Sequence, residues 1–193
     1  GELAPEDLAP AVCRAFIGGP GTAAHTLFQE VPTFAGAHDP RNRVIFATGP
    51  LTGSGVDGAV TASIVTVSAL SNGAVATNMN GTFALKLKAC GYDGIIIQGA
   101  SRRWVYLYIS SGGSAQLLDA SHLLGMDTWQ TEETLRTAYG DRASLRKDAT
   151  VSVACIGPAG ENLVSFTGVY SCQGHSASKG GTGSVLGAKR LKA

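Results

Sequence analysis

One stretch near the end of the sequence concentrates residues that suit phosphate binding. It consists of His175, Ser176, Ala177, Ser178, Lys179, Gly180 and Gly181. A cation flanked by hydroxyls and by uncovered backbone amides matches the charge and the acceptor oxygens of a phosphate group. A plain surface loop, with Lys179 as a solvated lysine, explains the same residues. Both interpretations stay open at the level of sequence.

A possible internal repeat of the sequence places a similar segment earlier in the chain. Residues 44–50 (VIFATGP) and 152–158 (SVACIGP) both describe a strand that runs into Gly-Pro. Further along each copy, the steps Asn80-Gly81 and Gly180-Gly181 precede an expected helix. A helix N-terminus presents unpaired amides and the positive end of the dipole, so two copies predict two phosphate-like sites. Chance similarity in a glycine-rich chain, or a duplication kept only for packing, explains the repeat equally well.

Familiar catalytic and metal-binding patterns are missing or misplaced. Residues 53–58 match the dinucleotide fingerprint GxGxxG, but the third glycine leads into an expected strand, so the stretch is predicted to be a turn. Neither the histidines nor the cysteines have metal-ligand spacing. These residues are His25, His38, His122, His175, Cys13, Cys90, Cys155 and Cys172. We expect reduced, mostly buried thiols and no catalytic residue within this chain.

The composition is that of a globular domain with no general affinity for polyanions. Of the 193 residues, 44% are hydrophobic and 15% are charged, which is sufficient to bury a core. The net charge of +1 gives no electrostatic reason to expect nucleic acid or an anionic membrane as a partner. The apolar runs are too short to span a bilayer, and no signal peptide is apparent. We expect a cytoplasmic protein.

Hydrophobic periodicity predicts helices and strands without the regular alternation of a doubly wound sheet. Helices are expected over residues 5–16, 22–30, 82–89 and 128–139, the last capped by Asp127. Strands are expected over residues 44–47, 60–67, 95–98, 104–109, 115–118, 151–156 and 163–170. Such a mixture predicts an α+β fold.

Five separated motifs span nearly the whole chain. They are residues 47–53 (ATGPLTG), 85–93 (LKLKACGYD), 119–122 (DASH), 156–162 (IGPAGEN) and 179–193 (KGGTGSVLGAKRLKA). In this order and at about this spacing, they resemble the N-terminal domain of the aldehyde:ferredoxin oxidoreductases, a family of tungsten-pterin enzymes. The form of residues 176–181 is somewhat closer to the branch that contains the tungsten subunit of benzoyl-CoA reductases.

The resemblance implies one domain over residues 1–193, built from two similar halves, about 1–100 and 101–193, whose mixed sheets form a base for the cofactor. That cofactor is tungsten, or molybdenum, held by two pterins whose phosphates share a magnesium ion. Cofactor contacts are implied for Asn78, Asn80, Gly81 and residues 175–181, and magnesium ligation for the backbone carbonyls of Asn78 and Ser176. The implied activity is oxidation of aldehydes or related carbonyl compounds, with ferredoxin as electron acceptor.

Two positions depart from the family pattern. The family usually has an arginine at the position of Thr61, where it bridges pterin and iron-sulfur cluster, and another close to His175; this chain has neither. A charge-assisted contact contributes about 1.5 to 3 kcal/mol, so the two losses weaken cofactor retention unless other groups substitute. An alternative is therefore a degenerate, non-catalytic binding or assembly module that has lost the cofactor.

The resemblance also implies that further domains complete the enzyme. In the family, the ligands of the four-iron four-sulfur cluster and the substrate channel lie in later domains. We therefore expect the missing C-terminal domains to be the main partner of this chain, with ferredoxin and a second copy in a homodimer as further partners. By itself, the chain is expected to fold but to show no activity.

Overall fold

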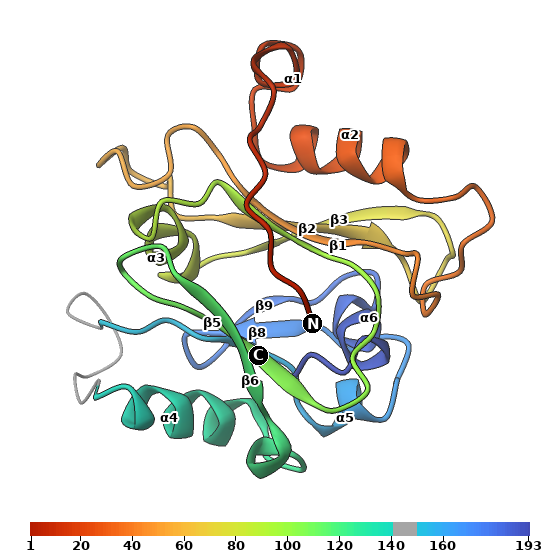
Figure 1. Cartoon of the computed structure of the whole chain (residues 1–193), viewed down its shortest axis with the longest axis vertical. Coiled ribbons are helices and arrows are strands. Elements are labelled where there is room, and N and C mark those ends of the chain that lie inside the picture. Colours follow the sequence, from red (N-terminus) through yellow and green to blue (C-terminus); the bar gives the residue numbers. More distant parts are fainter. Residues whose placement is uncertain (141–149) are drawn as a thin grey trace.

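The computed structural model of the protein describes residues 1–140 and 150–193. Its elements form layers (Figure 1). One helix lies on a four-stranded antiparallel sheet, a second group of strands with a short helix lies beneath that sheet, and further helices cover the far side. This mixture of helices and antiparallel sheets confirms the α+β fold class.

The first sheet has the strand order β3-β2-β1-β4 and is antiparallel throughout. Its strands are β1 (Val44–Thr48), β2 (Ala62–Val67), β3 (Ala74–Met79) and β4 (Gly94–Ile97). Successive side chains in a strand point to opposite faces. Ile45 and Val65 therefore pack under helix α2 (Pro20–Glu30), whereas Phe46 and Ile64 face the main core. Every residue of β1 and β2 is buried, so these strands form the centre of the domain.

The main core lies between the first sheet and the second layer. This layer contains β7 (Ala154–Cys155), β8 (Val169–Ser171) and β9 (His175–Ala177), followed by helix α6 (Thr182–Ala188). Val169, Val185 and Leu186 belong to the same buried cluster as Phe46 and Ile64. Each layer thus buries the apolar face of the other, which is the main source of stability that the fold offers.

The last residues join the second layer to the hairpin of β5 (Val105–Ile109) and β6 (Ala115–Asp119). Leu191 forms a parallel bridge with Val105, and the carbonyl of Lys192 accepts a hydrogen bond from the amide of Ile156, which follows β7. Residues 190–193 therefore lie between β5 and β7. The closing motif of the sequence is in this way a structural part of the second layer.

The two layers follow the same order of elements. In the first, three strands are followed by helix α3 (Phe83–Ala89) and the pairing strand β4. In the second, β7, β8 and β9, with the additional helix α5 between β7 and β8, are followed by α6 and the pairing segment 190–193. A duplication of one unit accounts for this order, but the duplication itself stays a prediction.

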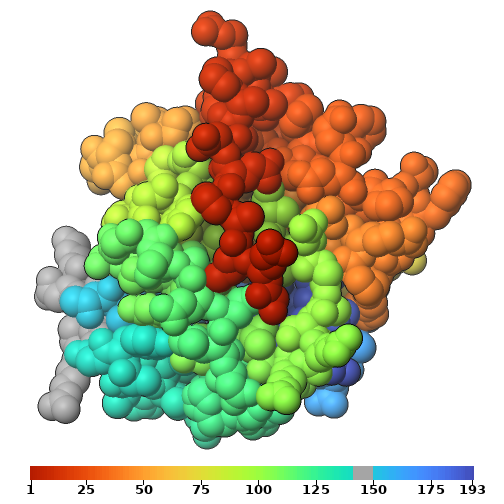
Figure 2. All heavy atoms as spheres, viewed as in Figure 1, coloured from red at the N-terminus to blue at the C-terminus, as the bar shows by residue number. Residues whose placement is uncertain are grey.

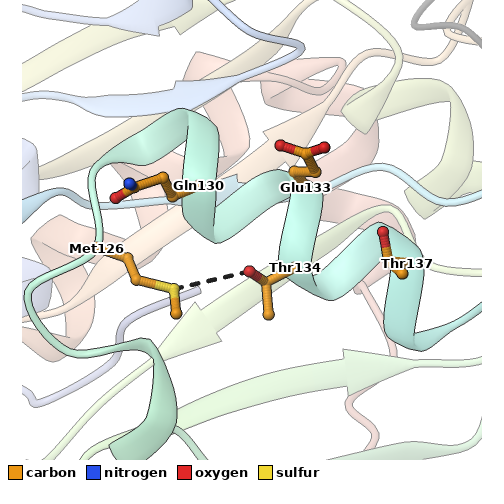
Figure 3. Close-up of a pocket in the computed structure, with 5 residues that line it drawn as sticks. All are labelled: Met126, Gln130, Glu133, Thr134 and Thr137. Carbon is orange, nitrogen blue, oxygen red and sulfur yellow. Dashed lines mark hydrogen bonds between the residues drawn. The ribbon is translucent and has the colours of Figure 1, made fainter.

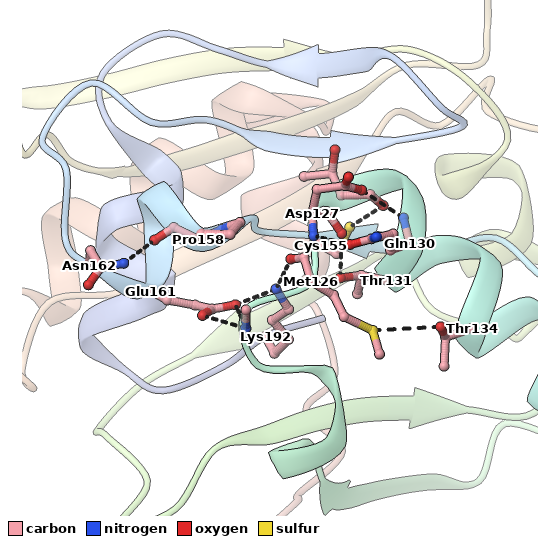
Figure 4. A network of polar contacts seen from close by, with 12 residues as sticks. Met126, Asp127, Gln130, Thr131, Thr134, Cys155, Pro158, Glu161, Asn162 and Lys192 are labelled. Carbon is pink, nitrogen blue, oxygen red and sulfur yellow. Dashed lines mark hydrogen bonds and ion pairs between the residues drawn. The ribbon is translucent and has the colours of Figure 1, made fainter.

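Helix α4 (Thr128–Ala138) and a buried ion pair close the far side of the second layer. The helix begins with a capping box between Asp127 and Gln130, which confirms the predicted cap. The Nζ atom of the fully buried Lys192 donates to the carbonyl of Met126 at 2.9 Å and pairs with Glu161 of α5 (Pro158–Glu161). Figure 4 shows Lys192 between these two partners. The short helix η1 (Ser121–Leu123) leads into this region.

Most of the expected elements are confirmed, with differences at both ends of the chain. Helix α1 (Pro10–Phe16) begins at Pro10 rather than at residue 5, because proline has no N–H to donate and fits the first turn of a helix but not its interior. Residues 53–58 form turns with no helix after them, as predicted. Strand β3 lies where we expect none, since Ala and Asn are poor strand formers.

The strands expected over residues 151–156 and 163–170 are shortened to β7 and β8, with α5 between them. The backbone of Leu163 has φ +58 and its amide donates to the carbonyl of Gly160, so this residue belongs to the turn after α5 and not to a strand. Residues 175–177 form strand β9, so the interpretation as a plain loop does not hold for this part of residues 175–181, whereas Lys179 is exposed and outside any strand.

The first residues of the chain lie across the surface of the molecule (Figure 2). Residues 1–10 are exposed along their whole length, and Gly1 contacts the side chain of Leu117 in β6. Among residues 1–140 and 150–193, no helix is long and apolar enough to cross a membrane.

Candidate functional site

The two stretches singled out by sequence meet beside β3. The amide of Lys179 donates to Thr77 Oγ1 at 3.4 Å, and a Cβ atom on Gly180 would lie 2.6 Å from Val75 Cγ1. Thr77 and Val75 are both residues of β3, so the chain that follows β9 runs along this strand. The structure thus brings residues 175–181 next to the segment that carries Asn78 and Asn80.

Asn78 and Asn80 each use one side-chain atom to contact a neighbouring hydroxyl. Ser63 Oγ donates to Asn78 Oδ1 at 2.9 Å, and Thr61 Oγ1 donates to Asn80 Oδ1 at 2.7 Å. Both asparagines are exposed, and no hydrogen bond joins either Nδ2 group to another described residue. Two oriented amide donors are therefore available to a ligand.

A cleft of about 610 Å³ opens next to these asparagines. Thr61, Ser63 and Asn78 line one part of it, and the glycine-containing turns at residues 18–20 and 49–52 line another. Of the described residues that line the cleft, Asp57 is the one with a charged side chain. The cleft therefore suits the uncharged, hydrogen-bonding part of a ligand, while the nearest cation of the sequence motif, Lys179, is exposed outside it.

Gly81 lies beneath the turn between β8 and β9. Its backbone has φ +104, and a Cβ atom there would lie 2.8 Å from Cys172 Sγ and 3.2 Å from His175 Cδ2. The amide of Thr82 donates to the same sulfur at 3.3 Å. Sequence analysis identified Gly81 and His175 but missed Cys172 and Thr82, because their contact joins residues 90 positions apart and has no local signal.

The other glycine step makes a reciprocal contact. The amide of Ala69, in the turn between β2 and β3, donates to the carbonyl of Gly180 at 3.1 Å. A Cβ atom on Gly181 would lie 3.0 Å from the Cβ atom of Ala69. The β2–β3 turn therefore packs on Gly180 and Gly181, and the β8–β9 turn packs on Gly81. These two contacts together fix the distance between Gly81 and Gly180.

Contacts within the chain occupy part of the N-terminus of α6. Thr182 is fully buried, and the amide of Gly183 donates to the carbonyl of Thr167 at 3.0 Å. Gly181 has φ +70, and a Cβ atom on it would clash with the carbonyl oxygen of Ser165. Close packing thus requires glycine here. The exposed side chains in this stretch are those of His175, Ser178 and Lys179.

A second hollow, of about 440 Å³, lies along the outer surface of α4. Figure 3 shows its lining, in which Thr134 Oγ1 donates to Met126 Sδ at 3.7 Å and Glu133 is the single titratable side chain. None of the residues selected from the sequence lies in this hollow. It therefore contributes nothing to the candidate site.

The described residues include no group of three or more His, Cys, Asp or Glu side chains that could hold a metal ion. All four cysteines are free thiols. We expected most of them to be buried, but only Cys155 is, and Cys13, Cys90 and Cys172 are partly exposed. Burial raises the pKa of the Cys155 thiol to about 12, so this group is protonated and unreactive at neutral pH.

Comparison with known proteins identifies the family to which these segments belong. The protein-family model for the aldehyde ferredoxin oxidoreductase N-terminal domain matches residues 1–193. The chain belongs to this family. The match covers the first sheet, the second layer and the contact between them, and it confirms the resemblance carried by the five sequence motifs.

Relatives of the aldehyde ferredoxin oxidoreductase family match over nearly the whole chain. The tungsten-containing aldehyde ferredoxin oxidoreductase of Pyrococcus furiosus is 34% identical over 193 residues, which are 100% of this chain and 31% of that protein. A WOR-like subunit of an aliphatic sulfonate oxidoreductase from the same organism is 35% identical over 197 residues, covering 97% of this chain and 31% of that protein.

A solved structure is similar over the complete chain. The active-site complex BamBC of benzoyl coenzyme A reductase, in complex with 1,5-dienoyl-CoA, matches with a TM-score of 0.92 and 35% identity, covering 100% of this chain and 28% of that one. This chain thus spans between 28% and 31% of the length of these three proteins. It corresponds to one part of a larger enzyme in each of them.

Proposed function

We propose that this chain is the cofactor-binding, N-terminal domain of a tungsten (or molybdenum) bis-pterin oxidoreductase that oxidises aldehydes or related carbonyl compounds and passes electrons to ferredoxin. The observation that carries the proposal is the match of the family model over residues 1–193. The names of the relatives, four of which are tungsten-containing aldehyde ferredoxin oxidoreductases, support tungsten as the metal.

The residues at the junction of β3 and β9 fit a phosphorylated pterin. The exposed Asn78 lines a cleft whose other lining residues include apolar side chains and the hydroxyls of Thr61 and Ser63, and Asn80 contacts Thr61 at its edge. A pterin ring offers acceptors for the Nδ2 donors of both asparagines. Exposed Ser178 and Lys179 supply a hydroxyl and a cation for phosphate. When bound, the metal and its pterins supply the redox chemistry, and this chain binds and orients them.

Within this proposal, the remaining contacts come from the backbone. The carbonyls of Asn78 and Ser176 would bind magnesium, and those backbone groups of Gly81 and of residues 176–181 that are not bonded within the chain would contact the phosphates. Magnesium prefers oxygen ligands in octahedral geometry and retains several waters, so two carbonyls and the phosphates suffice. The iron-sulfur cluster, the substrate channel, ferredoxin binding and a homodimer are assigned to the full-length protein.

Thr61 favours the alternative, a degenerate binding or assembly module without cofactor. Its hydroxyl bonds to Asn80 at 2.7 Å and brings no positive charge to the cleft. Metal analysis of the full-length protein, purified without oxygen, discriminates between the two functions. Stoichiometric tungsten or molybdenum together with iron supports the oxidoreductase. Folded protein that contains neither metal nor pterin would refute it and leave the degenerate module.

A further inference from the structure

The turn between β8 and β9 has a backbone that its own residues do not favour. Cys172 and Gln173 have φ +49 and +53, in the left-handed region, which costs a residue with a side chain about 1 kcal/mol or more. Neither is a glycine or an asparagine, the residue types that tolerate this conformation most readily. A contact from outside the turn must therefore stabilise it.

That contact is a buried carboxylate. Glu132 of α4 is 3% exposed, and its Oε2 atom accepts the backbone N–H of Gln173 at 2.9 Å. Burial raises the pKa of Glu132, while the hydrogen bond from the amide of Gln173, the charge of Arg136 and the nearby amide of Cys172 oppose that shift. A buried acceptor that binds the amide of a left-handed residue stabilises this conformation of the turn. Glu132 thus holds the turn in its observed shape.

The corresponding turn between β2 and β3 has a side-chain acceptor of its own. Ser68 Oγ accepts the amides of Leu70 and Ser71 at 3.0 and 3.2 Å, so the acceptor comes from the turn's own first residue. Its left-handed residue is Asn72, with φ +52, a type that adopts this conformation readily. The β8–β9 turn thus differs from the β2–β3 turn in that its side-chain acceptor, Glu132, comes from a separate helix.

The turn held by Glu132 contacts both parts of the candidate site. Cys172 Sγ accepts the amide of Thr82 and packs on Gly81, while His175 begins β9 directly after the turn. If the turn relaxed, both Gly81 and His175 would lose their common contact. The distance between the two segments proposed to hold the cofactor therefore depends on this turn.

We propose that Glu132 is a positioning residue for the cofactor site: its carboxylate fixes the β8–β9 turn and, through it, the spacing of Gly81 and His175. The inference rests on the proposed function. Glu132 itself is buried behind the turn, so it acts through Cys172 and Gln173. Supporting residues of this kind change metal affinity about 10- to 100-fold when they are replaced.

The test compares four forms of the full-length protein purified without oxygen: wild type, Glu132→Leu, Glu132→Gln and the control Glu133→Gln. Glu133 is the next residue of α4 and is exposed. Leu removes the acceptor of the Gln173 amide, whereas Gln keeps one oxygen to accept this amide but removes the negative charge. Tungsten and molybdenum per polypeptide and the electron paramagnetic resonance spectrum of the metal are measured for each.

We expect Glu132→Leu to lower metal affinity about tenfold and to broaden or shift the spectrum of the remaining metal, with Glu132→Gln in between and Glu133→Gln like wild type. Wild-type occupancy and spectrum in Glu132→Leu overturn the positioning role and leave the proposed function intact. A wild-type protein without metal or pterin overturns both. If Glu132→Leu does not fold, Glu132→Gln decides: a wild-type spectrum and occupancy overturn the role, and a change in either supports it.

Discussion

Cys172 Sγ lies so close to Gly81 that a Cβ atom on the glycine would come within 2.8 Å of it. The contact joins the end of the first hairpin to the turn of the second, and the amide of Thr82 reinforces it with a hydrogen bond to the same sulfur. Glycine is needed here for two separate reasons, the positive φ of +104 and the missing side chain.

These two reasons can be separated by comparing Gly81→Ala with Gly91→Ala. Gly91 has φ +91, but a Cβ atom on it would meet nothing within 4 Å. We expect Gly91→Ala to lose about 1 kcal/mol of unfolding free energy from backbone strain, and Gly81→Ala to lose about 1 to 3 kcal/mol more through overpacking. Urea denaturation of each variant measures the difference. Equal losses in the two variants would show that Cys172 moves aside without cost.

Elements with a strong local pattern were predictable from the sequence. β1 and β2 are runs of Val, Ile and Thr, and α4 carries a capping residue at Asp127, so propensity and capping both agree with the final structure. β9 was not predictable as a strand. Its three residues, His-Ser-Ala, have little strand propensity, and they pair because β8 and the turn held by Glu132 place them.

The site was predictable as a set of segments, but not in its contacts. Residue types and the family resemblance indicated Asn78, Asn80 and residues 175–181, and the structure brings these segments together along β3. The bond from the amide of Gly183 in α6 to Thr167 was not predictable, because it depends on tertiary packing. Glu132 carried no sequence signal, since a glutamate on a helix is usually a solvated residue.

Lys189 gives the fold a dependence on pH. Its Nζ atom is 2.7 Å from the carbonyl oxygen of Asn42, 3.0 Å from that of Gly99 and 3.4 Å from that of Pro40. Burial, and to a smaller extent Arg43, lower the pKa of Lys189 from 10.5 to about 8, while Asp39 opposes the shift. The three carbonyls match the three N–H groups of the ammonium form, but they do not offset the loss of solvation.

The sign of the pH effect follows from the lowered pKa. Between pH 8 and 10.5 the unfolded chain binds more protons at Lys189 than the folded chain, so unfolding free energy from this group rises with pH. The full contribution, up to about 3 kcal/mol, is present above pH 10.5 and is lost as pH falls through 8. We expect Lys189→Met to remove this slope. Parallel stability curves for wild type and variant across this range would contradict the assignment.

The buried pair of Lys192 and Glu161 should be costly to break from one side. The Lys192 side chain is fully buried, and the Glu161 carboxylate also accepts the amide of Gly125 at 3.0 Å. Lys192→Met leaves Glu161 without its counter-charge, so we expect a loss of about 3 to 5 kcal/mol in unfolding free energy. Adding Glu161→Leu should recover part of this loss, because no buried charge remains. Urea denaturation of the single and double variants measures both effects.

A matched control for the buried pair is the surface pair of Lys88 and Asp93, whose carboxylate side chain is 64% exposed. Lys88→Met should change the unfolding free energy by no more than about 1 kcal/mol. If the variants of Lys192 and Lys88 lose similar amounts, burial does not control the strength of the pair.

Lys179 and Thr61 test whether the cofactor site is active or lost. Lys179 is exposed, and its amide is fixed to Thr77 on β3, so its side chain starts from a defined place at the edge of the site. Lys179→Ala removes a charged contact, and we expect tungsten and pterin affinity in the full-length protein to fall about tenfold, since such a contact contributes about 1.5 to 3 kcal/mol. Arg103→Ala, at another exposed cation, is the control and should leave occupancy unchanged.

Thr61→Arg makes the opposite change. Thr61 lines the cleft beside Asn78, so an arginine there brings a positive charge to a surface whose lining side chains, among the described residues, include the acidic Asp57 but no cation. We expect higher metal occupancy or faster electron transfer to the iron-sulfur cluster, because guanidinium donates several hydrogen bonds in a fixed plane. Metal analysis and reduction kinetics of the full-length variant measure both. Full wild-type metal occupancy in Lys179→Ala would refute the role of that lysine. If Thr61→Arg raises neither metal occupancy nor the rate of electron transfer, other groups of the protein already hold the pterin without an arginine at this position.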